Sequence, residues 1–72
     1  MKIEMRTTIS DGEQDALEAW VYEHANEFDT VAVYRVGLTM YRAGMPPTTV
    51  VHHPGHIADA LADALAVVRG NS

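Results

Sequence analysis

The sequence predicts an α+β fold, in which a small antiparallel sheet of three or four strands is covered on one face by two helices. Two kinds of pattern predict it. Apolar residues alternate with polar ones in some segments and recur at helical spacing in two others. These segments follow one another as strand, helix, strand, an optional further strand, strand and helix. The 72 residues leave room for a single domain, residues 1–72.

The first two elements are predicted from residues 2–28. Residues 2–9 alternate, with an apolar side formed by Ile3, Met5, Thr7 and Ile9. Ser10 and Glu13 then have the spacing of a capping box, in which the Glu13 carboxylate reaches back to the Ser10 amide. A helix over residues 13–28 follows. Its apolar stripe comprises Leu17, Trp20, Val21, His24 and Phe28. We expect His24 to be a core residue with one hydrogen-bonding partner.

Residues 31–42 are rich in β-formers and alternate without a break through Gly37. They form either one long strand with a bulge at Gly37 or a hairpin that turns near Val36-Gly37. The prolines at positions 46 and 47 indicate a loop, and residues 48–52 a further strand. After the break at Pro54-Gly55, residues 57–69 predict a second helix, with Gly70-Asn71 as its C-terminal cap.

The acidic charge is concentrated in the first part of the chain. The net charge is −5, but residues 1–29 hold eight acids and two bases, whereas residues 30–72 hold two acids and three bases. This distribution predicts an acidic surface that binds a basic protein partner; a merely solvated helix face is the alternative. The predicted partner-binding residues are Glu13, Asp15, Glu18, Tyr22, Glu23, Arg35 and Tyr41.

A histidine cluster follows the last predicted strand. His52, His53 and His56 lie within five residues, and Asp59 lies one helical turn beyond His56. Imidazole and carboxylate groups suit a transition metal, so these four residues are the candidate metal ligands. The competing interpretation is a polar corner between strand and helix, because His52 and His53 point to opposite faces of a strand.

Several functional classes lack support in the sequence. There is no cysteine, which excludes disulfides and thiolate metal sites. No G-x-S-x-G, P-loop or G-x-G-x-x-G motif is present, so we expect neither an enzyme nor a cofactor. No apolar run reaches the ~18 residues that span a membrane. Glu4 and Arg6 interrupt the apolar run that a signal peptide needs, and we expect a cytoplasmic protein.

The element order after the first strand resembles that of the double-stranded RNA-binding domain. That family clamps phosphate with a lysine cluster at the start of its last helix, and the matching segment here, residues 52–56, has no lysine. The net charge of −5 also opposes binding to a phosphate backbone. Direct binding of nucleic acid is therefore not expected.

The function predicted from these patterns is stoichiometric, non-enzymatic binding. A small acidic regulator or inhibitor of a basic, nucleic-acid-handling complex, of the kind that phages and mobile elements use against host defence, fits the charge and size. The first alternative is a metal-binding protein or metal-dependent enzyme built on the histidine cluster. The second is a structural homodimer that buries the open face of the sheet, where we expect Val31, Val33 and Tyr41, because so short a chain buries little apolar surface by itself.

Overall fold

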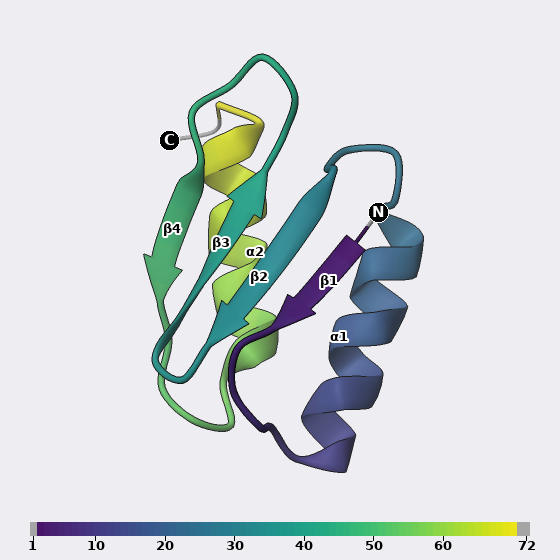
Figure 1. Cartoon of the computed structure of the whole chain (residues 1–72), viewed down its shortest axis with the longest axis vertical. Coiled ribbons are helices and arrows are strands. Elements are labelled where there is room, and N and C mark those ends of the chain that lie inside the picture. Colours follow the sequence, from purple (N-terminus) through teal and green to yellow (C-terminus); the bar gives the residue numbers. More distant parts are fainter. Residues whose placement is uncertain (1, 71–72) are drawn as a thin grey trace.

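The computed structural model describes residues 2–70 and confirms the α+β fold (Figure 1). Its elements follow the predicted order, and the sheet has four strands. They are β1 (Lys2–Met5), α1 (Asp11–Glu23), β2 (Thr30–Tyr34), β3 (Gly37–Tyr41), β4 (Thr48–Val51) and α2 (Ile57–Val68). The strands lie side by side in chain order, and α2 runs behind them in Figure 1 while α1 flanks the β1 side.

The prediction of an antiparallel sheet is wrong for β1: the sheet is mixed, because β1 and β2 are parallel and the other two pairs are antiparallel. α1 connects the two parallel strands, as a crossover connection requires. It follows that β1, β2 and β4 run in the same direction and end at one edge of the sheet. Both helices begin just after strands that end there, so two helix N-termini and three strand ends meet at this edge, the lower one in Figure 1.

Residues 31–42 form a hairpin and not one long strand. Tyr34 pairs with Gly37 across a two-residue turn, and His52 donates its amide to the Val36 carbonyl at 2.9 Å. A Cβ on Gly37 would lie 3.0 Å from the Val50 carbonyl oxygen, so the close approach of β4 favours glycine at this position.

The hairpin also corrects the predicted composition of the open sheet face. Since residue 34 pairs with 37, the alternation reverses across the turn, and Val33 lies opposite Leu38. Val31 and Val33 are fully buried on the helix side, contrary to the expectation that they face outward. The outward positions of the hairpin belong to Ala32, Tyr34, Thr39 and Tyr41.

One hydrophobic core lies between the sheet and the two helices. α1 contributes Leu17 and Val21, while Phe28 enters from the segment that follows it. The sheet and α2 supply the rest, namely Val31, Val33, Leu38, Met40, Ile57, Ala60, Leu61, Ala64, Leu65 and Val68. Burial of one face of each helix is what the two predicted stripes require.

Two predicted elements end several residues early in the structure. β1 stops at Met5 because the last bond to β2 runs from the Arg6 amide to Val33, next to the hairpin turn. α1 ends at Glu23, where the His24 amide and its Nδ1 both donate to the Trp20 carbonyl. His24 is partly buried and lies outside the buried core cluster. It has the predicted bond to a backbone carbonyl, a second contact of 4.0 Å from Nε2 to Glu27 Oε2, and a stacking contact with Trp20 at 4.3 Å between ring centroids.

The end of α2 agrees in part with the predicted cap. Arg69 closes the helix, and Gly70 has φ +75°, the left-handed conformation typical of a residue that follows a helix. Asn71, the other predicted cap residue, lies outside the described residues. Arg69 also forms a bidentate contact with Glu27, at 2.9 and 3.0 Å, which ties this end of α2 to the segment after α1.

Candidate functional site

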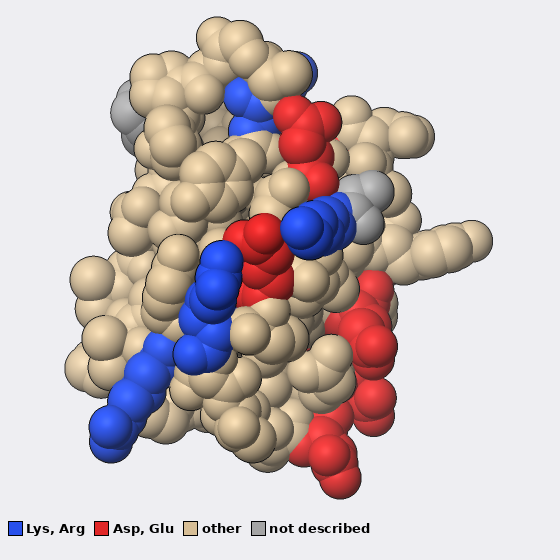
Figure 2. Space-filling model, in the orientation of Figure 1, with Lys and Arg blue, Asp and Glu red and all other residues tan. Residues whose placement is uncertain are grey.

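The outward face of α1 carries a line of polar side chains, which we call the acidic ridge: Asp11, Asp15, Glu18 and Tyr22. Their spacing of four, three and four residues places them on one line of the helix, on its exposed side and away from Leu17. All four are exposed, and Tyr22 reaches 85%. Among residues 2–70, no ridge carboxylate takes part in an ion pair. Figure 2 shows acidic side chains following α1.

The other predicted partner-binding residues lie elsewhere. Glu23 is exposed at the end of α1, to the side of the ridge. Arg35 lies in the hairpin turn, and Tyr41 pairs with Thr30 on the open sheet face. The structure therefore gathers Asp15, Glu18 and Tyr22 into one surface and separates the remaining predicted residues from it.

Glu13 links the two helices. Its amide donates to Ser10 Oγ at 3.3 Å, as the capping box predicts. Its carboxylate does not reach back to Ser10 but accepts from the amide of Ile57, the first residue of α2, at 3.3 Å. His56, at the N-cap of α2, makes no side-chain capping bond, so Glu13 supplies the acceptor that this helix end lacks.

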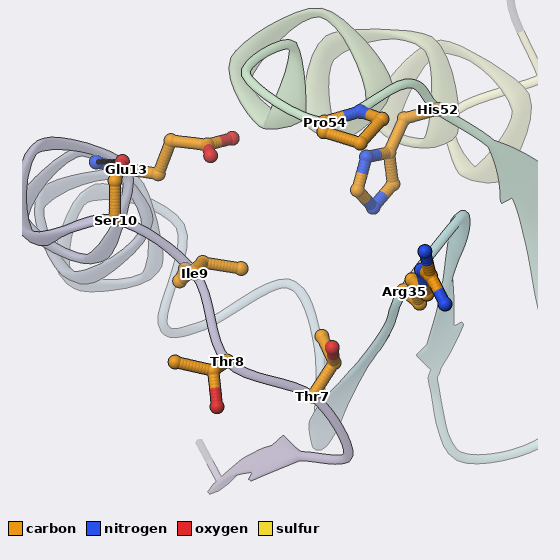
Figure 3. A pocket seen from close by; sticks show the side chains of 8 residues that line it. All are labelled: Thr7, Thr8, Ile9, Ser10, Glu13, Arg35, His52 and Pro54. Carbon is orange, nitrogen blue, oxygen red and sulfur yellow. Dashed lines mark hydrogen bonds between the residues drawn. The ribbon is translucent and has the colours of Figure 1, made fainter.

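A cavity of about 460 Å³ lies at the edge where the strands and helix N-termini meet (Figure 3). It is lined by Thr7, Thr8, Ile9, Ser10, Glu13, Arg35, His52 and Pro54. Three of these residues were singled out in the sequence for different reasons: Glu13 and Arg35 as partner contacts and His52 as a metal ligand. The fold brings them together from α1, the hairpin turn and the end of β4.

His52 is the buried polar group of this cavity. Its side chain points into the space in Figure 3, and the residue is only 6% exposed. Nδ1 lies 3.1 Å from the His53 carbonyl oxygen, which can only accept, so Nδ1 carries a proton. In the neutral ring Nε2 is then an acceptor, and this buried atom has no hydrogen-bond partner.

The four candidate metal ligands do not form a metal centre. They line a second hollow of about 240 Å³, together with Val51, Ala60 and Asp63. His56 Nδ1 lies 3.7 Å from Asp59 Oδ2, but His52 Nδ1 is bonded to the His53 carbonyl. In the described part of the chain, no three His, Asp or Glu side chains are arranged to hold a metal ion. The geometry favours the polar corner between β4 and α2.

Sequence reasoning missed most of the cavity lining, namely Thr7, Thr8, Ile9, Ser10 and Pro54 as members of a site. Each was assigned to a strand side, a cap or a chain break. The available signal was the strand–helix–strand order at the start of the chain. A parallel crossover there places the ends of the first and second strands beside the start of the first helix.

No family model matches the chain, and neither the curated proteins nor the solved structures include a match to it. Within residues 2–70, no helix is long and apolar enough to cross a membrane.

Proposed function

We propose that this protein acts without catalysis, by stoichiometric binding of a basic protein partner through the acidic ridge. The observation that carries the proposal is the line of three carboxylates and one tyrosine on the exposed side of α1. Because the carboxylates have no cationic partner within residues 2–70, their charge is available to an incoming surface.

Tyr22 gives the ridge an anchor as well as charge. Exposed tyrosines often supply much of the binding energy in protein interfaces, because they bury a large rigid ring and keep a polar tip. Here the ring stands one turn beyond Glu18 and is 85% exposed, so it contributes little to folding. A partner that pairs lysine or arginine with Asp15 and Glu18 would cover this ring at the same time.

The partner that we propose is the basic surface of a nucleic-acid-handling complex, which a small acidic protein would occupy as a regulator or inhibitor. Such surfaces carry clustered lysine and arginine that normally face phosphate. The net charge of −5 favours attraction to them at long range. A phage or mobile-element protein that blocks a host defence complex would work in this way, in the cytoplasm.

The test is a quantitative pull-down from the native host with three forms of the protein: wild type, the ridge variant D15K/E18K and the control variant D59K/D63K. Both variants raise the net charge by the same amount, since each replaces two acids, but the control changes exposed positions of α2. We expect the wild type and the control to retain the same basic partner and the ridge variant to bind it at least about tenfold more weakly.

The same partner should respond to salt and to Tyr22. Raising the salt concentration should weaken wild-type binding more than that of the ridge variant, because exposed charges are screened. Y22A should cost about 2 kcal/mol of binding, the size of an interface anchor, without changing stability. Equal retention by the ridge variant and the control, or capture of no basic protein, contradicts the proposal.

The second candidate function is a structural homodimer through the open sheet face. In the described part of the chain neither helix covers this face, and Tyr34 and Val51 are 42% and 78% exposed at one end of it. Lys2 and Arg6 lie on the same side and are both paired with Glu4, so the face is less acidic than α1 (Figure 2). Two copies joined there would keep their acidic ridges apart.

A further inference from the structure

The cavity at the strand-end edge of the sheet has the position and size of a small-molecule site. Ligands of α/β folds commonly bind outside the carboxyl ends of the strands, and the cavity here lies at the ends of β1, β2 and β4. Its volume of about 460 Å³ is in the usual range for such sites. Because its walls come from segments far apart in sequence, the tertiary fold fixes their relative positions.

The unpartnered nitrogen of His52 indicates which group a ligand must present. Buried polar atoms nearly always have a hydrogen-bond partner, and those without one require an explanation. Since Nδ1 donates to His53, Nε2 needs a donor. No residue within 2–70 provides this donor, so a hydroxyl, amine or ammonium group from outside the chain would complete the bond.

Glu13 provides a second acceptor at the same cavity. One of its oxygens, Oε2, is bonded to the Ile57 amide, and Oε1 has no hydrogen-bond partner among the described residues. Figure 3 shows this carboxylate reaching into the cavity from α1, while the His52 ring enters from the β4 side. A negative carboxylate and a bare imidazole nitrogen together favour an ammonium group over a neutral hydroxyl.

Arg35 provides the opposite charge at another part of the rim. It lies in the exposed hairpin turn and forms no ion pair within residues 2–70. Its guanidinium has the planar set of donors that matches a carboxylate. In Figure 3 it stands on the other side of the cavity from Glu13.

We infer that the cavity binds a small free amino acid. The ligand's ammonium group would donate to His52 Nε2 and Glu13, and its carboxylate would accept from Arg35. A simple anion would satisfy Arg35 but would face the Glu13 carboxylate and the Nε2 lone pair. A simple cation would leave Arg35 without a partner. Only a zwitterion matches all three side chains.

The experiment is an NMR titration of the 15N-labelled wild-type protein with L-alanine, with acetate and methylammonium as probes that carry only one half of the zwitterion. We expect saturable shifts at the amides of residues that line the cavity and at His52 Nε2. The dissociation constant for L-alanine should be at least about tenfold lower than for either half-ligand, because both ends are held at once.

Substitutions of two arginines test whether L-alanine binds in this cavity. R35Q should weaken L-alanine binding at least about tenfold, whereas the control R42Q, which changes an exposed arginine outside the cavity lining, should leave it unchanged. H52Q should also lose L-alanine binding. Because substitution of this buried residue can also impair folding, the shift of His52 Nε2 in the wild-type protein tests the same contact without a substitution.

The inference is overturned if L-alanine causes no saturable shift at the cavity at millimolar concentration. It is also overturned if acetate binds as well as L-alanine, or if R42Q weakens binding as much as R35Q does. None of these results depends on the acidic ridge.

Discussion

Replacing Glu13 with alanine should destabilise the protein by removing the link between its two helices. In the wild type, the Glu13 carboxylate accepts from the Ile57 amide at 3.3 Å. Ile57 is 1% exposed, so water cannot readily take the place of the carboxylate at this amide. The Ser10 cap of α1 remains in the variant, because there the Glu13 amide is the donor.

The size of the effect follows from this geometry. Hydrogen bonds to charged groups contribute about 1.5–3 kcal/mol, and the 3.3 Å distance places this one at the lower end. A carboxylate at a helix N-terminus adds about 0.3–1 kcal/mol. Because Glu13 is only partly buried, solvent screens this contact, and the loss of unfolding free energy for E13A should be about 1.5 kcal/mol. In a chain of this size that lowers Tm by about 10 °C.

Urea unfolding followed by the fluorescence of Trp20, the sole tryptophan, measures this loss. The control is E18A, which removes an exposed carboxylate from the same helix and should change stability by less than about 0.5 kcal/mol. E13Q keeps an amide oxygen that can accept but has no charge, so its stability should lie between those of the wild type and E13A.

Amide hydrogen exchange separates the observed link from the capping box that the sequence predicts. If Glu13 bonds to α2, E13A should lose protection at the Ile57 amide and leave the exchange rate of the Ser10 amide unchanged. Loss of protection at Ser10 with Ile57 unchanged, or an E13A no less stable than E18A, refutes the reasoning.

Two further predictions concern the sheet. G37A should lower the free energy of unfolding, measured in urea, by about 1 kcal/mol, because its Cβ would lie 3.0 Å from the Val50 carbonyl oxygen. The control G12A, in α1, has nothing within 4 Å of its new Cβ and should raise the free energy of unfolding by up to about 1 kcal/mol. Equal effects of the two substitutions contradict the close approach. If the open face forms a homodimer, light scattering after size exclusion should give twice the 7.9 kDa chain mass, and V51K should give the monomer; a monomeric wild type at every concentration excludes this dimer.

The extent to which the candidate site could be predicted differs between its two parts. Asp15, Glu18 and Tyr22 share a line because helical spacing is a local property, so the ridge could be predicted from the sequence alone. The cavity could not, because Glu13, Arg35 and His52 come from three distant segments. Their residue types drew notice, but nothing local indicates that they meet.

The sequence by itself determined the type and order of the elements. Alternation of apolar residues, two helical stripes and the Ser10 cap depend on interactions within a few residues, which is why the strands and helices appear close to their predicted positions. The acidic character of α1 is equally local, since the helix carries its own charges.

The tertiary structure decided the pairing, the faces and the site. An unbroken alternation through Gly37 fits both a strand and a hairpin, and only the contact with β4 and the pairing of Tyr34 with Gly37 select the hairpin. That turn moves Val31 and Val33 from the expected open face into the core. The parallel placement of β1 requires the α1 crossover, and the start of α1 then lies beside the start of α2, where the Glu13 carboxylate accepts from the Ile57 amide instead of that of Ser10. These outcomes depend on contacts between segments far apart in the chain, whose geometry local patterns do not encode.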